Sequence, residues 1–173
     1  MSQATIDGTS RGAARVESSG ARRSTAPAIL RTGDSIVPFI LRLALAVVIF
    51  PHGAQKVLGW FGGYGIAGTL GFFGSMGIPL AFGVLALAAE FLGPIGLLTG
   101  LLGRVAAFGI ACVMVVAIAT AHLANGFFMN WSGQQAGEGF EYHLLVIAMS
   151  LAIMVAGSGR WSVDRLLTRR GER

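Results

Sequence analysis

Long apolar runs, separated by polar or glycine-rich segments, dominate the pattern of this chain. The runs cover residues 36–58, 79–102, 104–124 and 141–157. A helix of about 20 residues, rising about 1.5 Å per residue, crosses the hydrocarbon core of a bilayer. Backbone groups in lipid must find partners within their own segment, so such runs predict helices. The pattern therefore predicts an all-α fold, a four-helix transmembrane bundle.

The connections between the runs differ in character. Residues 59–78 carry many glycines together with Trp60 and Tyr64, which are typical of a membrane interface. We expect a short or broken helix there, lying at the outer interface between the first two spans. Residues 125–140 form a polar and aromatic loop without Lys or Arg.

The two ends of the chain are basic and polar. Residues 1–33 are rich in Ser, Ala, Gly and Arg and show no apolar periodicity, which predicts a disordered cytoplasmic tail. Residues 34–159 then form the membrane domain. Residues 160–173 are a second basic tail, in which Ser162 is a candidate N-cap for a short amphipathic helix.

Composition supports an integral membrane protein. Hydrophobic residues make up 54% of the chain and charged residues 12%, about half of the roughly 25% that soluble domains carry. Mean hydropathy is +0.69. The net charge of +5 does not indicate nucleic-acid binding, because the arginines gather in the two terminal segments. The single cysteine, Cys112, excludes an intramolecular disulfide and predicts a small packing residue.

The distribution of arginines predicts the orientation. Both tails are rich in arginine, and the short second connection carries Arg104, whereas the first and third connections have no basic residue after Lys56. Positive residues favour the cytoplasmic side, so both termini should be cytoplasmic. Arg42 and Arg104 are expected to be interface anchors that extend toward lipid headgroups.

Glu90 lies near the middle of the second run, and it organises the remaining polar residues. A charged carboxylate facing lipid costs at least about 2.5 kcal/mol, so Glu90 should be neutral, paired or turned inward. In the predicted topology, the polar residues of the other three runs lie in the same half of the membrane as Glu90. These residues are His52, Gln55, Lys56, His122, Glu141 and His143.

This constellation permits several chemistries. Lys56 and Glu90 are either a structural ion pair between two helices or the polar centre of a catalytic site. His52, Gln55, His122, Glu141 and His143 are candidate cofactor-binding residues. Quinone binding would use a His or Lys beside a proton-carrying carboxylate. A metal or bis-histidine haem is less favoured, because neither H-x-x-x-H nor H-E-x-x-H occurs.

Simpler interpretations stand beside these. His122 and His143 are also compatible with a wet interface position. Glu141, at the start of a helix, complements the helix dipole without any chemical role.

The order and spacing of short motifs resemble the DoxX family of small bacterial membrane proteins. The resemblance covers about residues 35–165. It rests on Arg42, His52-Gly53-x-Gln55-Lys56, Glu90 with Gly93 and Gly96, Gly100-x-x-Gly103-Arg104, His122, Gly126-Phe127, Gly139-Phe140-Glu141-Tyr142 and Gly157-x-Gly159-x-x-Ser162-x-Asp164.

The resemblance implies a multi-pass protein of the bacterial plasma membrane, with a role as an oxidoreductase subunit. Some members are similar to a subunit linked to quinone chemistry, and some assemble with soluble redox enzymes. The expected partners are the lipid bilayer, a soluble or membrane redox protein, and a second copy of the chain. A non-enzymatic membrane scaffold is the main alternative, and a small-solute transporter is the third.

Overall fold

The structure is a computed structural model that describes residues 27–170. This part of the chain contains six α-helices and no strand, so the all-helical prediction is confirmed there. The helices are α1 Val37–Leu58, α2 Gly65–Ser75, α3 Leu80–Thr99, α4 Gly103–Ala117, α5 Glu141–Ala156 and α6 Val163–Arg170. Of the two predicted tails, residues 1–26 and 171–173 lie outside the described residues.

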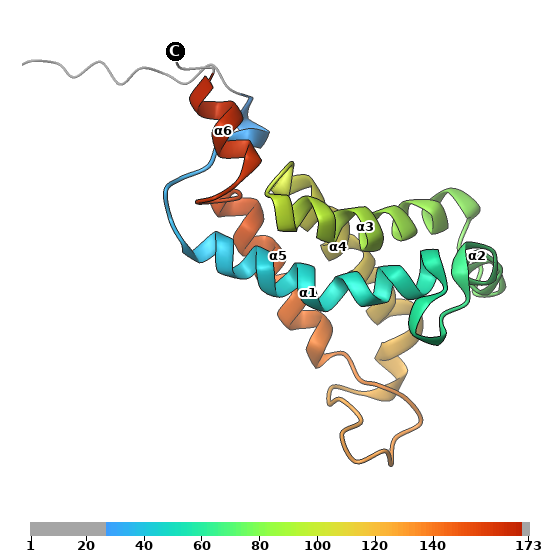
Figure 1. The fold of residues 1–173 in the computed structure, drawn as a ribbon. Helices are drawn as coiled ribbons and strands as arrows, with labels where there is room; N and C mark the ends of the chain where they lie inside the picture. Colours follow the sequence, from blue (N-terminus) through green and yellow to red (C-terminus); the bar gives the residue numbers. More distant parts are fainter. Residues whose placement is uncertain (1–26, 171–173) are drawn as a thin grey trace, which may run out of the picture.

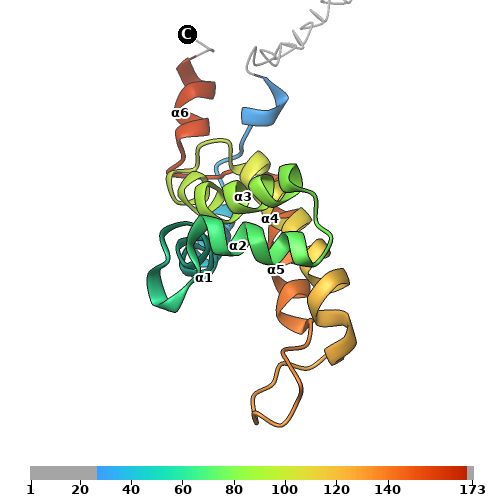
Figure 2. The same ribbon diagram turned by 90° about the vertical axis from the view of Figure 1, so that its right-hand side faces the viewer.

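The helices form two crossing pairs (Figure 1). α1 and α3 lie side by side, and α4 and α5 form the second pair behind them. α3 also contacts α4, and α1 contacts both α2 and α5. The connection between α4 and α5 extends away from the helices on the side opposite α6, in both views (Figures 1 and 2).

Proline and glycine define the ends of the long helices. Pro38 lies in the first turn of α1, where its missing N–H leaves no hydrogen bond unmade. α1 ends at Leu58 and is capped by Gly59, which is left-handed with φ +71°. α3 ends at Thr99 and is capped by Gly100, where the Gly100 N–H donates to the Leu97 carbonyl and the Leu101 N–H donates to the Gly96 carbonyl. This is a Schellman motif, which satisfies the last carbonyls of the helix.

The glycine-rich segment after α1 contains the short helix that the sequence predicted. α2 has 11 residues and packs against α1 and α3. Its Thr69 hydroxyl, which is buried, donates to the Lys56 carbonyl at 3.4 Å. A Cβ on Gly83 of α3 would lie 3.0 Å from Leu70, so the small residue permits the close packing of α2.

α4 continues beyond its regular turns. Ile118–His122 form a π-helical turn and Leu123–Asn125 a 3₁₀ turn. The whole stretch Gly103–Asn125 is therefore one helical rod of 23 residues. Together with α1 and α3, it gives three helices that are long and apolar enough to cross a membrane, whereas α5 has 16 residues.

A small apolar core holds the helices together, while many large apolar side chains face outward. The buried core residues come from four helices and include Leu45, Ile49, Leu97, Ile110, Met114, Val146 and Ile153. Exposed apolar side chains occur on all four of these helices, for example Val47, Phe82, Val115 and Leu145. Soluble monomers rarely expose so much contiguous apolar surface. The Cys112 side chain is also exposed.

The N-terminal segment before α1 lies against α6. Ala28–Leu30 form a 3₁₀ turn, and the Thr168 hydroxyl donates to the Leu30 carbonyl at 3.0 Å. The Gly159 N–H donates to the Thr32 hydroxyl. Residues 27–33 of the predicted tail are thus in contact with α6 and with the turn that precedes it.

Candidate functional site

α1 and α3 cross at Gly53 and Glu90. A Cβ on Gly53 would lie 2.1 Å from the Glu90 carbonyl oxygen, closer than real Cβ atoms approach backbone. Only a glycine therefore allows the two backbones to come this near. The contact fixes the depth of Glu90 relative to the last two turns of α1.

Lys56 and Glu90 form the ion pair that the sequence predicted. The Lys56 ammonium lies 2.5 Å from both carboxylate oxygens of Glu90. The Glu90 side chain is 4% exposed, and the Lys56 side chain is 31% exposed. The carboxylate is buried between the helices, while the lysine reaches it from the edge of the α1–α3 interface.

Two rings lie beside this pair. His52 precedes Gly53 on α1, and its ring centre is 6.5 Å from that of Tyr142 at the start of α5. The Tyr142 hydroxyl is buried and has no hydrogen-bond partner among the described residues. The His52 side chain is exposed.

The other two histidines are in direct contact. The rings of His122 and His143 have centres 4.1 Å apart. His143 is 6% exposed, so its prediction as a wet interface residue is wrong. Its Nδ1 atom is buried, with no partner in residues 27–170. The His122 Nδ1 lies 2.9 Å from the Glu138 carbonyl oxygen, which makes it a donor.

These residues define one group, which we call the Lys56–Glu90 cluster. It contains Lys56, Glu90, His52, Tyr142, His143 and His122, contributed by four helical segments. Histidines and carboxylates from distant parts of the chain therefore do converge. Tyr142 is the member that the sequence reasoning did not single out as a site residue.

Two sequence candidates lie outside the cluster. The Gln55 amide donates to the Phe61 carbonyl at 3.3 Å, so it stabilises the turn after α1. The Glu141 carboxylate accepts from the Met129 N–H at 2.9 Å and from the Trp131 indole at 3.4 Å. Glu141 therefore holds the α4–α5 connection, and both side chains have local structural partners.

The geometry bears on metal and haem binding. Within residues 27–170, no three His, Cys, Asp or Glu side chains are grouped closely enough to hold a metal ion. His122 and His143 touch each other, so no porphyrin fits between these two rings. Haem ligation by this pair does not fit the arrangement.

A second polar group lies at the opposite end of α1, around Arg42. The Arg42 guanidinium donates to the carbonyls of Leu97 at 2.5 Å and Leu98 at 3.2 Å, at the end of α3. It also donates to Arg160 at 3.2 Å and Trp161 at 2.9 Å. Arg42 is 1% exposed, so its prediction as an interface anchor is wrong. It joins α1, α3 and the turn before α6.

Asp164 completes this second group, which we call the Arg42–Asp164 cluster. Its carboxylate accepts from the Leu102 N–H at 2.8 Å, the Gly103 N–H at 3.1 Å and the Ser158 hydroxyl at 2.6 Å. These N–H groups open α4, so Asp164 compensates the positive end of that helix. A Cβ on Gly103 would lie 2.3 Å from the Ser158 hydroxyl oxygen, so a larger residue would displace the hydroxyl that donates to Asp164.

Arg104 likewise forms hydrogen bonds within the fold, although the sequence predicted an anchor that extends toward headgroups. It donates to the Met154 carbonyl of α5 at 2.6 Å and to the Arg31 carbonyl at 3.0 Å. Its Nε is buried without a partner among the described residues. Arg104 therefore ties α4 and α5 to the N-terminal segment.

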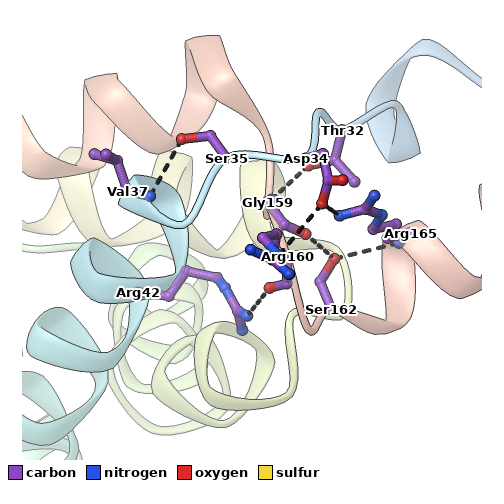
Figure 3. Close-up of polar contacts among 9 residues, drawn as sticks. All are labelled: Thr32, Asp34, Ser35, Val37, Arg42, Gly159, Arg160, Ser162 and Arg165. Carbon is purple, nitrogen blue, oxygen red and sulfur yellow. Dashed lines mark hydrogen bonds and ion pairs between the residues drawn. The ribbon is translucent and has the colours of Figure 1, made fainter.

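A surface ion-pair group covers the same end (Figure 3). Asp34 contacts the guanidinium groups of Arg160, at 3.4 Å, and Arg165. The hydrogen bond from Arg165 holds the pKa of the Asp34 carboxyl below its ordinary value of 3.8. This contribution to stability is complete above pH 3.8 and is lost as the pH falls through the lowered value.

The Ser162 hydroxyl accepts a hydrogen bond from the Arg165 N–H and is the N-cap of α6.

The fold and its surface define the class of protein. Helices of membrane-spanning length, with apolar side chains facing outward, make this an α-helical integral membrane protein.

The family follows from comparison with known proteins. The family model DoxX matches residues 37–123, just over half of the chain, and the protein belongs to the DoxX family. The matched region runs from the start of α1 past His122, and includes Lys56 and Glu90. No curated protein and no solved structure matches the chain.

Proposed function

We propose that the protein is the membrane subunit of a redox system, and that it binds a quinone or a similar small apolar molecule at the Lys56–Glu90 cluster. One observation carries this proposal. The buried Lys56–Glu90 ion pair lies beside two buried polar atoms, the Tyr142 hydroxyl and His143 Nδ1, which have no partner in the described chain. Ionisable residues inside membrane-spanning segments are rare, and they commonly mark functional sites.

The residues of the cluster fit a quinone chemically. Its two carbonyl oxygens accept hydrogen bonds, and a tyrosine hydroxyl and a protonated imidazole nitrogen donate them. A bound quinone would supply two-electron redox chemistry coupled to protons. Tyr142 and His143 would bind and orient its oxygens, and His52 would lie at the exposed edge of the site.

Lys56 and Glu90 would exchange protons with the bound quinone. Glu90 is the carboxylate of the cluster and can accept or release a proton at a carboxylate oxygen, and the Lys56 ammonium donates to both of these oxygens. His122 contacts His143 on one side and the α4–α5 connection on the other. The two histidines therefore reach from the cluster toward that connection.

The same proposal includes a topology. Residues 34–159 form a four-helix transmembrane bundle of the bacterial plasma membrane, with α1, α3, the α4 rod and α5 as spans and both termini cytoplasmic. The N-terminal segment and α6 lie together at one end, which supports this arrangement. α5 is about 24 Å long at the helical rise. It is short for a span, and Phe140 and Gly157 cap its two ends.

The direct test is purification in mild detergent, followed by mass spectrometry of extracted small molecules and an absorption spectrum. We expect quinone to copurify with the chain. Glu90→Gln should lower the quinone content and the quinone reduction supported by membranes. Glu138→Gln is the matched control, because within residues 27–170 its carboxylate accepts a hydrogen bond only from the Asn130 N–H. Equal quinone content in all three proteins would reject the proposal.

A membrane scaffold is the second candidate. The observation that favours it is the mutual satisfaction of Lys56 and Glu90 at a tight helix crossing, which needs no chemistry. A scaffold would recruit a soluble or membrane redox partner, or a second copy of the chain. It predicts that Glu90→Gln and Lys56→Met reduce protein abundance and partner recovery. Loss of redox activity with unchanged abundance and recovery would exclude it.

A further inference from the structure

A hollow of about 240 Å³ lies at the end of the molecule where α1 begins. It is formed by the N-terminal segment, the first turns of α1 and the last turns of α5. Its walls include Ser35, Val37, Leu41, Ala152, Ala156 and Gly159. Most of this lining is aliphatic, and Val37 is 57% exposed. Because Val37 is the first residue of a membrane-spanning helix, the hollow lies at a membrane boundary.

Charged residues adjoin two of the lining residues in the sequence, and Figure 3 shows the ion pairs that they form. Ser35 and Gly159 line it, and the neighbouring residues Asp34 and Arg160 form an ion pair. Arg165 contacts the same carboxylate, and Arg169 lowers its pKa through space. One carboxylate therefore faces three guanidinium groups, and the border keeps a positive excess.

We infer that this hollow is a binding site for one anionic phospholipid. An acyl chain lies along the aliphatic wall between α1 and α5, and the phosphate binds the Arg160 guanidinium at the border. The inference uses the membrane position of α1 and does not depend on redox activity.

Arg160 is suited to the phosphate. Its side chain is 48% exposed and, among the described residues, forms an ion pair only with the exposed Asp34 carboxylate, so most of its donors remain accessible. Guanidinium groups bind phosphate through parallel hydrogen bonds. The guanidinium also lies 5.4 Å from the centre of the Trp161 ring, and Trp161 is exposed. Aromatic rings of this kind prefer the headgroup level of a membrane.

Charge and aliphatic lining together select the lipid as occupant. An anion in water would need only the arginines, and a neutral lipid would need only the apolar wall. Basic pockets between membrane helices bind anionic headgroups in this way. The site thus predicts a preference for phosphatidylglycerol or cardiolipin over phosphatidylcholine.

The charge is tested by native mass spectrometry of the full chain in a neutral detergent, with phosphatidylglycerol or phosphatidylcholine added. We expect phosphatidylglycerol to bind more tightly than phosphatidylcholine. Arg160→Gln should weaken phosphatidylglycerol binding about fivefold. Asp34→Asn should tighten it. Arg169→Gln removes the same charge from α6, but Arg169 acts on Asp34 only through space, whereas Arg160 directly follows the lining residue Gly159 and pairs with Asp34, so the effect of Arg169→Gln should be smaller. Equal losses of phosphatidylglycerol binding in Arg160→Gln and Arg169→Gln would mean that the lipid responds to the general positive charge of this end. That result would overturn the site.

The apolar wall is tested with a volume change. Ala152→Leu fills the hollow from α5 and should reduce phosphatidylglycerol binding, while Ala81→Leu, at an exposed position of α3, should not. Inorganic phosphate alone should not displace the lipid at equal concentration. Retention of full binding in Ala152→Leu, or displacement by phosphate, would overturn the inference.

Discussion

At the scale of single residues, the partners of the buried charges determine how much a substitution destabilises the protein. Lys56 and Glu90 neutralise each other, whereas Arg42 is held by four backbone carbonyls. Removing one partner of a buried pair is costly because the other charge stays in a poorly solvated place. The cost therefore depends on how far each remaining group can reach water.

Lys56→Met should destabilise the protein more than Glu90→Gln. The first change leaves a carboxylate that is 4% exposed without its cation, and we expect a loss of about 3 kcal/mol. The second leaves a lysine that is 31% exposed and can turn toward water, so a loss of about 1 kcal/mol is expected. Thermal unfolding in detergent measures the difference, and the reverse order would contradict the assigned burial.

Arg42→Lys should loosen the end of the molecule that carries α6. A lysine ammonium cannot match the planar guanidinium, which donates to α3 and to the turn before α6 at once. We expect a loss of about 2 kcal/mol. Hydrogen exchange of α6 should rise. Arg160→Lys, at an exposed side chain, should leave exchange unchanged, and equal exchange in both variants would reject this role for Arg42.

The site residues were partly predictable from their types. Glu90 is a carboxylate inside an apolar run, so the cost of the charge made a buried pairing with the single lysine one of the predicted arrangements. Arg42 looked like a headgroup anchor, because its carbonyl partners belong to turns whose place in space the sequence does not reveal. Tyr142 was missed because tyrosine at the start of a membrane helix is common at interfaces.

At the scale of elements, the α1–α3 crossing positions the ion pair. Gly53 allows the contact, and a methyl group there would meet the Glu90 backbone. Gly53→Ala should therefore separate the helices, cost about 1–3 kcal/mol and lengthen the Lys56–Glu90 contact.

Gly71→Ala is the matched control for this change. Gly71 is a helical glycine in α2, and a Cβ there would meet nothing within 4 Å. Alanine also favours helices, so Gly71→Ala should be neutral or stabilising. Melting temperatures of the two variants provide the comparison. Equal behaviour would show that the crossing does not need its glycine.

The long helices were predicted well because apolar runs and proline or glycine ends are local signals. α1 begins and ends within one residue of its predicted range. The docking of residues 28–32 on α6 and on its preceding turn was not predictable. It depends on contacts such as Thr32 with Gly159, which join residues 127 positions apart. No local pattern encodes such a pairing.

At the scale of the whole molecule, the two polar clusters lie at opposite ends of α1. Arg42 and Lys56 are 14 residues apart in one helix, or about 21 Å. The Arg42–Asp164 cluster ties helix ends and both terminal segments together. The Lys56–Glu90 cluster holds a buried carboxylate, histidines and the unpartnered Tyr142 hydroxyl, which are groups that can bind or transfer a proton. At the other end, the buried atoms without a partner among the described residues are the Nε atoms of Arg42 and Arg104. We therefore propose that the Lys56–Glu90 cluster carries the function and that the Arg42–Asp164 cluster stabilises the fold.

The proposed topology makes a labelling prediction. In a Cys112→Ser background, Gln134→Cys in the α4–α5 connection should react with a membrane-impermeant maleimide in intact cells. Arg169→Cys on α6 should react only after the membrane is permeabilised. Both side chains are exposed, so access depends on the side of the membrane. Labelling of both positions from the same side would contradict the four-span arrangement.

Depth along the membrane predicted which residues would gather, but not all of them did. Gln55 and Glu141 lie at about the expected level, yet their side chains turn to local backbone and loop partners. The direction in which a helix face points depends on how the pairs α1–α3 and α4–α5 cross. That crossing is a property of the packed molecule.

The central claim is that the Lys56–Glu90 cluster binds a quinone, and the most direct measurement is the quinone content of the purified protein. Wild-type protein, Glu90→Gln and Glu138→Gln would be extracted and quantified side by side at matched folded fractions. The account predicts quinone in wild-type protein and Glu138→Gln, and a several-fold loss in Glu90→Gln. Absence of quinone from folded wild-type protein, or equal amounts in all three, would contradict it.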